Sequence, residues 1–299
     1  MSSHTQVDPQ HRFITLPDGR RVAIAEYGDP GGRTLLALHG APASRLMFAV
    51  AGEAAKRHGL RLIAPDRPGY GLTPPDTGER SLASYGDDIA AIADALGLSH
   101  VGLIGVSGGA PYAVAAAARL GDRVTVLALV SPLGPIADLG KDVAIHSAQR
   151  WFFLKVPRTR VLLGLGARAF VAGFKLAPRL CLAVFARALG GPDRVTLLKP
   201  GPGDQLIAMT AEAVRQGPVG AMADMAVFGR PWDVVLANVT APAILWQGTA
   251  DRIVPPQASF HLARLLPSCR VARIEGAGHF WVLEHVDEVL GEIAVMGER

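Results

Sequence analysis

The chain has 299 residues, of which 49% are hydrophobic and 19% are charged, and its formal net charge is +4. A chain of this length buries roughly three quarters of its unfolded surface, enough for one large α/β domain or for a domain with an insertion. The sequence shows no nucleic-acid-binding motif and no basic cluster interleaved with aromatic residues, so nucleic acid is not an expected partner. Residues 1–9 lack a basic start followed by an apolar stretch, so we expect no secretory signal and a cytoplasmic location.

Short apolar segments alternate with helix-like segments over the first 130 residues. The first two strands flank a Pro-Asp-Gly turn and form a hairpin, whereas residues 34–38 are continuously apolar, as in a strand buried on both faces. Strands are expected at residues 12–16, 21–27, 34–38, 60–64, 101–104 and 124–130, and helices at 45–58, 81–96 and 110–120. This alternation predicts a mostly parallel sheet with helices on both faces.

The pattern changes after the sixth strand. From residue 134 to residue 238 the sequence contains helical pieces separated by prolines, and no buried-strand run occurs. The alternation then resumes with strands at 243–247 and 270–274 and helices at 256–266 and 281–295. The predicted fold class is therefore α/β, with a mostly parallel central sheet flanked by helices and an inserted helical cap. The expected domains are a first core part (1–133), the cap (134–238) and a second core part (239–299).

The basic excess of the chain lies in the predicted cap, where 13 Lys and Arg face 7 Asp and Glu. Because these charges are spread out, we favour solvated helix faces over a binding site for an anionic ligand. The most membrane-like stretch is 161–185, but Arg168, Lys175, Arg179 and a proline interrupt it, so it falls short of the roughly 20 residues of a span. We interpret it as packed lid helices in preference to a helix on a membrane surface.

A serine stands at the junction of a predicted strand and a predicted helix, in the sequence Gly105-Val106-Ser107-Gly108-Gly109. Glycines two positions to either side allow a turn that is too tight for ordinary side chains. Such a turn lifts the Ser107 hydroxyl above the strand ends, and it leaves the Gly108 N–H where an attacked carbonyl oxygen becomes negative. Because the pattern also occurs in ordinary turns, its interpretation depends on the rest of the chain.

Polar residues also follow the last two predicted strands: Asp251 comes after 243–247, and His279 comes after 270–274. Ligands of open α/β sheets bind beyond the carboxyl ends of the strands, so a serine, an acid and a histidine are expected to meet there. Asp122 and Asp138 are weaker candidates for the acid. The other histidines lie in the N-terminal arm, near helices, in the cap or in the loop after 34–38; they are His4, His11, His39, His58, His100, His146, His261 and His285.

The chain resembles the α/β-hydrolase superfamily from about residue 12 to the C-terminus. The resemblance rests on five segments that occur in order: His39-Gly40, 66–71, 105–109, 248–255 and Gly278-His279. It implies that Ser107 is the nucleophile, that His279 is the general base and acid, and that Asp251 orients and stabilises the imidazole. A serine hydroxyl needs such a base near neutral pH, and the ordinary pKa of histidine suits that task.

The resemblance also places a second oxyanion donor at the Ala41 N–H, beside the Gly108 N–H. Pro42 has no N–H and is excluded. His39 and Gly40 are expected to support the shape of this loop. Asp66 and Arg67 are expected to hold neighbouring loops in place and not to contact the substrate.

The expected activity is cleavage of a carboxylic ester, lactone or thioester of a small, largely apolar substrate through an acyl-serine intermediate, without metal or organic cofactor. One alternative is a C–C bond hydrolase that acts on a diketo acid, whose carboxylate could use the basic cap. The other is a ligand-binding relative without turnover. The resemblance argues against epoxide hydrolases and haloalkane dehalogenases, which use an aspartate as nucleophile. It also argues against proline iminopeptidases, which carry a tryptophan after the nucleophile and an acidic cap.

The expected partner is a small-molecule substrate, with no membrane span, and the chain is expected to be a monomer or a homodimer. Aromatic residues and methionines of the cap are candidates to line an apolar pocket, although packing alone is the preferred role for each. They are Trp151, Phe152, Phe153, Phe170, Phe174, Phe185, Met222, Met225 and Phe228. Cys181 and Cys269 lie outside any metal or redox motif and are expected to be reduced, buried thiols.

Overall fold

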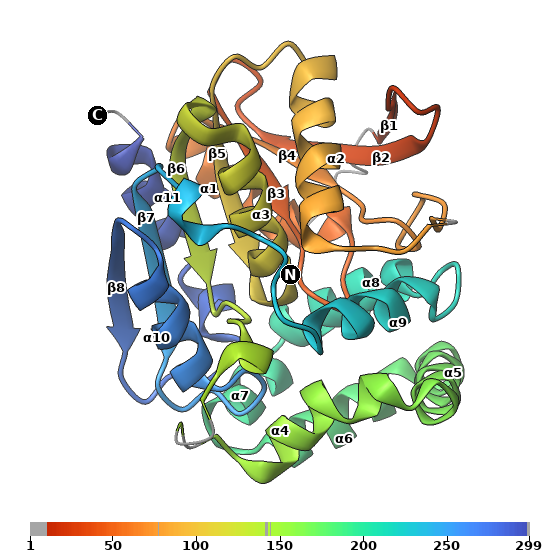
Figure 1. Ribbon diagram of the computed structural model, residues 1–299. Helices are drawn as coiled ribbons and strands as arrows, with labels where there is room; N and C mark the ends of the chain where they lie inside the picture. Colours follow the sequence, from red (N-terminus) through yellow and green to blue (C-terminus); the bar gives the residue numbers. More distant parts are fainter. Residues whose placement is uncertain (1–10, 77, 141–142, 144, 298–299) are drawn as a thin grey trace.

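A sheet of eight strands forms the centre of the computed structural model, which describes residues 11–76, 78–140, 143 and 145–297 (Figure 1). The strands are β1 (Arg12–Thr15), β2 (Arg21–Gly28), β3 (Arg33–Leu38), β4 (Leu60–Pro65), β5 (Val101–Val106), β6 (Val124–Val130), β7 (Ala243–Gly248) and β8 (Cys269–Ile274). Their order is β1-β2-β4-β3-β5-β6-β7-β8. β2 is antiparallel to both of its neighbours, and all other pairs are parallel. The predicted, mostly parallel α/β sheet is therefore confirmed.

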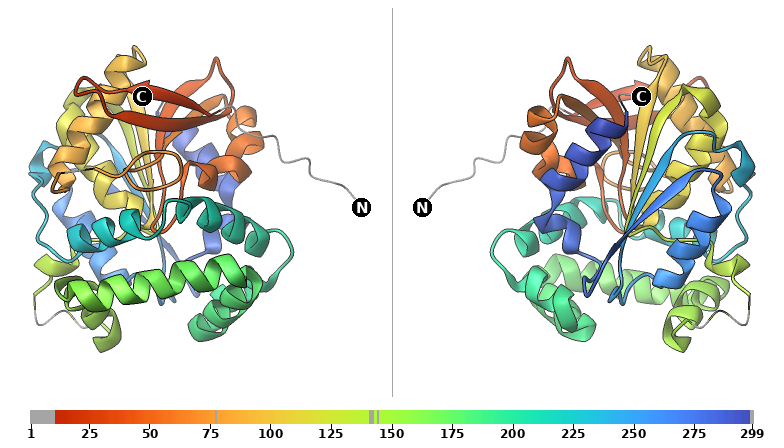
Figure 2. Two further views of the ribbon diagram at one scale, coloured as in Figure 1. Left: turned by 90° about the vertical axis from the view of Figure 1, so that its right-hand side faces the viewer. Right: turned by 90° about the vertical axis from the view of Figure 1, so that its left-hand side faces the viewer.

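Helices cover both faces of this sheet, which Figure 2 shows nearly edge-on. On one face α2 (Leu82–Ala95), α3 (Ala110–Leu120) and α10 (Pro256–Leu265) pack against one apolar cluster. On the other face α1 (Gly52–Arg57) and α11 (Val286–Met296) pack against a second cluster. Because both faces are covered, all six residues of β5 are buried, in agreement with its continuous apolar sequence.

The helix ends follow local signals in the sequence. Ser81 caps α2, since its hydroxyl accepts from the Ser84 N–H while the Ser84 side chain bonds back to Ser81. The chain leaves this helix through Gly97, whose φ is +67°. Two expected helices are interrupted: a 3₁₀ helix (Arg45–Ala51) precedes α1, and another (Trp281–Glu284) precedes α11. The apolar periodicity continues through both changes, so it did not predict them.

Most of the described segment between β6 and β7 is helical. Its α-helices are α4 (Ser147–Leu154), α5 (Arg160–Leu176), α6 (Pro178–Leu189), α7 (Gly191–Leu198), α8 (Pro202–Ala213) and α9 (Val219–Phe228). They lie beyond the carboxyl ends of the parallel strands, at the bottom of all three views (Figures 1 and 2). We call this segment the cap; its bounds at residues 134 and 238 stay a prediction. Among the described residues, no helix is long and apolar enough to cross a membrane.

Both cysteines are free thiols, but they are partly exposed and not buried as predicted. Cys269 begins β8, the last strand of the sheet, so it lacks a neighbouring strand on one side. Cys181 lies on α6, in the outer part of the cap. No cluster of three or more His, Cys, Asp and Glu that could hold a metal ion is found in the described part of the chain.

Candidate active site

Ser107 occupies a strained turn between β5 and α3. Its φ is +52°, a left-handed conformation that costs a residue other than glycine about 1–3 kcal/mol. Two glycines make room for the turn. A Cβ on Gly109 would lie 2.2 Å from the Leu38 carbonyl oxygen, and one on Gly105 would lie 2.7 Å from the Ala113 Cβ. The G-x-S-x-G pattern is therefore explained by close packing around Ser107.

Ser107, His279 and Asp251 come together although they are far apart in the sequence. The His279 Nε2 lies 2.9 Å from the Ser107 Oγ, and the His279 Nδ1 lies 2.7 Å from the Asp251 Oδ2. The three residues follow β5, β8 and β7, at the carboxyl edge where the strand order placed them.

The Asp251 carboxylate is buried and fully hydrogen-bonded. Its Oδ1 accepts the N–H groups of Ile253 and Val254 at 2.8 and 2.9 Å, and its Oδ2 accepts the Gln247 side-chain amide at 3.0 Å. These donors fix the position of the carboxylate. Its Oδ2 accepts the His279 Nδ1 proton, so Nε2 is left to accept the proton of the Ser107 hydroxyl.

The environment of His279 raises its pKa above the usual value of the side chain. Burial acts to lower this pKa, but the charge and hydrogen bond of Asp251 outweigh it, with a further contribution from Asp193. The backbone of His279 is also held, because its carbonyl oxygen accepts the Ser131 hydroxyl at 3.1 Å.

Asp193, on α7 of the cap, is a buried carboxylate that sequence reasoning did not select. It accepts the Phe280 N–H at 2.9 Å, and a Cβ on Gly278 would lie 2.4 Å from its carboxyl carbon. A cap residue therefore contacts the loop that carries His279. The sequence around Asp193 carries no motif that could have indicated this contact.

The two predicted oxyanion donors lie beside Ser107. A Cβ on Gly108 would lie 2.9 Å from the Ala41 Cβ, and one on Gly40 would lie 3.5 Å from the Ser107 Cβ. In the part of the chain that is described, the Ala41 N–H has no hydrogen-bond partner. Phe228, from α9, covers Gly108 from the cap side at 3.0 Å from the same Cβ position. Two backbone amides thus border one small space next to the serine.

The loop before Ala41 is held by His39 and Arg67. The His39 Nδ1 donates to the Gly40 carbonyl at 2.8 Å, while its Nε2 accepts the Arg67 N–H at 3.1 Å. The Arg67 guanidinium donates to the carbonyl oxygens of His39 and Gly40. Burial and the charge of Arg67 hold the pKa of His39 well below its ordinary value, so the ring is neutral and suited to a structural role.

Asp224, on α9, balances the charge of Arg67. Their side chains form a fully buried ion pair at 2.8 Å. The same carboxylate accepts the Tyr70 hydroxyl at 2.8 Å, the Tyr112 hydroxyl at 2.7 Å and the Arg80 guanidinium at 3.2 Å. We call these five residues the Asp224 cluster. It fastens the cap to the loop that carries Ala41.

The remaining candidates lie elsewhere. Asp66 pairs with Arg45 at 2.6 Å and accepts a backbone N–H of its own loop, so it holds loops together. Asp122 accepts the Thr240 hydroxyl, and Asp138 accepts the N–H of Trp232. His4 lies outside the described residues.

The predicted pocket lining divides into two groups. Phe228 covers Gly108, and Phe185 packs edge-to-face with Phe280, the neighbour of His279, at 6.2 Å between ring centres. Trp151 and Phe152 are instead turned to solvent, and so is Phe170. Packing alone, the role preferred for each of them from the sequence, is therefore wrong for these three exposed side chains.

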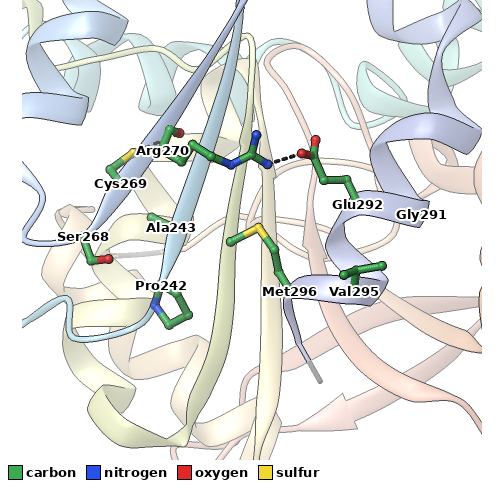
Figure 3. Close-up of a pocket in the computed structure, with 9 residues that line it drawn as sticks. All are labelled: Pro242, Ala243, Ser268, Cys269, Arg270, Gly291, Glu292, Val295 and Met296. Atoms are coloured by element: carbon green, nitrogen blue, oxygen red, sulfur yellow. Dashed lines mark hydrogen bonds and ion pairs between the residues drawn. The ribbon is translucent and has the colours of Figure 1, made fainter. Parts of the chain in front are cut away.

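A groove of about 840 Å³ lies at the opposite end of β7 and β8 (Figure 3). Pro242 and Cys269 stand on its strand side, and an ion pair between Arg270 and Glu292 connects it to α11. None of the candidate site residues lines it. We therefore place the candidate active site at the cap end and not in this groove.

Comparisons with known proteins show the family to which the chain belongs. A family model described as alpha/beta hydrolase fold matches residues 33–286. A 2-hydroxymuconate semialdehyde hydrolase from Pseudomonas putida is 28% identical over 76% of this chain and 73% of its own length. A haloalkane dehalogenase from Mesorhizobium japonicum is 26% identical over 78% of this chain and 74% of its own length. Among solved structures, an alpha/beta hydrolase fold protein from Nakamurella multipartita has a TM-score of 0.70 and 26% identity, covering 96% of this chain and 98% of its own.

Proposed function

Because the chain belongs to the α/β-hydrolase family, we propose that it is a serine hydrolase that cleaves a carboxylic ester, lactone or thioester of a small, largely apolar substrate. The observation that carries this proposal is the chain of contacts from the Ser107 hydroxyl through His279 to Asp251. Nothing in the proposed reaction requires a metal or an organic cofactor.

The first half-reaction forms an acyl-enzyme. The Ser107 oxygen attacks the acyl carbon while its proton moves to the His279 Nε2, and the negative charge that develops on the carbonyl oxygen is held by the Ala41 and Gly108 N–H groups. Asp251 stabilises the imidazolium. When the tetrahedral intermediate collapses, the proton on Nε2 passes to the departing alcohol or thiol.

The second half-reaction releases the acid. His279 removes a proton from a water molecule, whose oxygen attacks the acyl carbon of acyl-Ser107. The same two N–H groups hold the oxyanion. The bond to Ser107 then breaks, and the proton on Nε2 returns to the Ser107 oxygen.

The residue at position 107 argues against a dehalogenase. The family resemblance implies that haloalkane dehalogenases use an aspartate as nucleophile, which forms an alkyl ester that water can hydrolyse. Attack of the Ser107 oxygen on an alkyl halide would release the halide ion and leave an ether, and no step of the proposed mechanism cleaves an ether. The similarity to the Mesorhizobium dehalogenase therefore supports the family and not that reaction.

A second candidate is cleavage of a C–C bond in a diketo acid. It is favoured by the similarity to the Pseudomonas hydrolase, whose named substrate is a small unsaturated acid, and by the basic composition of the cap. Both candidates use the same Ser107 and the same oxyanion donors, so they differ in substrate and not in machinery.

The test is a substrate panel with a matched variant. The purified protein is given aryl esters of increasing acyl length, lactones, thioesters and a vinylogous diketo acid. Ser107→Ala is compared with Ser268→Ala, a serine at the far end of the sheet. Hydrolysis of oxygen or sulfur esters that is lost only in Ser107→Ala supports the proposal. Cleavage of the diketo acid alone supports the second candidate, and ester turnover that survives in Ser107→Ala contradicts both.

A further inference from the structure

The outer cap helices expose apolar side chains to solvent. Val161 is 73% exposed, Leu176 is 85% exposed and Leu180 is 64% exposed. Leu162, Leu165 and Val184 are exposed in the same way. We call these six residues of α5 and α6 the outer cap face. Isolated exposed apolar residues are ordinary, but six on two successive helices form a feature that indicates a partner.

The orientation of α5 produces this face. Val171 and Phe174 point inward and are buried, whereas Val161, Leu165 and Leu176 lie on the opposite side of the same helix. The apolar residues of α5 therefore form two stripes, one toward the molecule and one toward solvent. The prediction of packed lid helices is correct for the inner stripe and wrong for the outer one.

Basic residues surround this apolar face. Residues 145–198 contain nine Lys and Arg and one acidic residue, Asp193, which is buried at the His279 loop. Arg168, Lys175 and Arg187 are exposed on α5 and α6 and have no ion-pair partner among the described residues. The face therefore combines exposed apolar side chains with an uncompensated positive charge.

We propose that the outer cap face docks on the surface of an anionic lipid bilayer. An amphipathic helix with leucines on one side and Lys and Arg beside them lies in the headgroup region, where the apolar residues leave water and the cations meet lipid phosphates. Because α5 and α6 lie at the carboxyl end of the sheet, docking turns the Ser107 end of the molecule toward the bilayer (Figures 1 and 2).

A second copy of the chain fits this face less well. In a two-fold symmetric contact the same patch would meet itself, so the exposed Arg168, Lys175 and Arg187 would face the same cations of the other copy. Asp204 of α8 is exposed, but it lies 3.7 Å from Arg179, and Arg168, Lys175 and Arg187 have no ion-pair partner among the described residues. An anionic bilayer supplies the missing charge.

The experiment is co-sedimentation of the full chain with vesicles. One set contains phosphatidylglycerol and phosphatidylcholine, and the other contains phosphatidylcholine alone. Binding to the anionic vesicles is expected to be at least about tenfold tighter and to weaken as salt is raised. Equal binding to both sets, or binding to neither, overturns the proposal.

Two pairs of variants test the residues. Lys175→Glu/Arg187→Glu is expected to lower anionic-vesicle binding by roughly tenfold or more, while Lys56→Glu/Arg264→Glu, two exposed cations on α1 and α10, leaves it near wild type. Leu176→Gln is compared with Leu265→Gln, an exposed leucine of α10. Equal losses within either pair contradict a specific face.

Size-exclusion chromatography and circular dichroism complete the test. A folded, monomeric Leu176→Gln variant that loses vesicle binding supports the proposal. A wild-type chain that elutes as a dimer, becomes monomeric in Leu176→Gln and does not bind vesicles assigns the face to a second copy and overturns it. Ester turnover in solution is expected to be unchanged in all four variants, so the test does not depend on the proposed reaction.

Discussion

The site around Ser107 and the outer cap face depart from the usual distribution of side chains in opposite directions. At the site, charged groups are buried: Asp251, Asp224 and Arg67 are all removed from water, and each is paired or hydrogen-bonded. On α5, apolar groups such as Leu176 are exposed, and no described residue covers them. The buried charges are stabilised inside the molecule, whereas the exposed leucines are left for a partner outside it.

The inner and outer helices of the cap therefore have different roles. Its inner helices α7 and α9 send Asp193 and Asp224 toward the loops of the site, where they act on His279 and on the Ala41 loop. Its outer helices α5 and α6 present a surface on their solvent side, while the inner side of α6 packs against Phe280 through Phe185. Substitutions in the inner helices are therefore expected to change catalysis and stability, and those in the outer helices to change binding.

The largest effect is expected from Asp251→Asn. An amide at this position cannot hold the His279 proton on Nδ1 as the carboxylate does, so kcat should fall by roughly 10⁴-fold while the fold is kept. Steady-state turnover and circular dichroism measure this, with Asp122→Asn as the control. A kcat within about tenfold of wild type would remove Asp251 from the proposed mechanism.

Removal of Asp224 should be the most damaging change for stability. Asp224→Ala leaves the buried Arg67 without its counter-charge, and breaking such a pair costs about 3–5 kcal/mol. Urea unfolding gives the free-energy difference. Asp204→Ala on α8, whose side chain is exposed and lies 3.7 Å from Arg179, should leave stability unchanged. Equal midpoints for the two variants would show that the Asp224 cluster does not hold the cap.

The pH dependence of kcat/KM should show the influence of the cap on His279. The base must be neutral, and its pKa is raised in the folded protein, so activity on acidification is lost at a higher pH than for an ordinary histidine. Asp193→Asn removes one contribution to that rise and should move the acidic limb to lower pH. Asp204→Asn is the control. If the acidic limb of the kcat/KM profile keeps its position in Asp193→Asn, or moves to higher pH, Asp193 does not raise the pKa of His279.

The smallest effect is expected on the outer cap face. Leu176→Ala removes an exposed side chain and should change the free energy of unfolding by less than about 0.5 kcal/mol, whereas Leu245→Ala in the centre of β7 should cost about 2–5 kcal/mol. Urea unfolding of both variants compares the two regions directly. A large loss in Leu176→Ala would mean that this leucine is covered in solution.

The sequence predicted the sheet because its strands could be recognised, and it predicted the positions of the three candidate residues because each of them follows a strand. β3, β5, β6 and β7 are mostly buried and consist largely of apolar residues. Ser107 and Asp251 follow two of those strands, and His279 follows β8, a strand also expected from the sequence although it is not a buried apolar run. Polar residues that follow parallel strands meet at one edge of the sheet. Ser107, Asp251 and His279 could therefore be selected without knowledge of any contact.

The contributions of the cap could not be predicted in this way. Asp224 meets Tyr70 across 154 positions, and Asp193 meets Phe280 across 87, and neither contact follows from a local pattern. The direction in which α5 faces is also undetermined by its sequence, because apolar residues occupy both of its sides. For that reason the expectation of packed lid helices holds for the inner stripe of α5 and fails for the outer one.

The central claim is that Ser107 is an activated nucleophile, and intact-mass measurement after treatment with a fluorophosphonate tests it most directly. We predict a single covalent adduct, located on Ser107 by peptide mapping, that is absent in Ser107→Ala and present in Ser268→Ala. A folded protein that gives no adduct, or one that carries the adduct on another residue, would contradict the account.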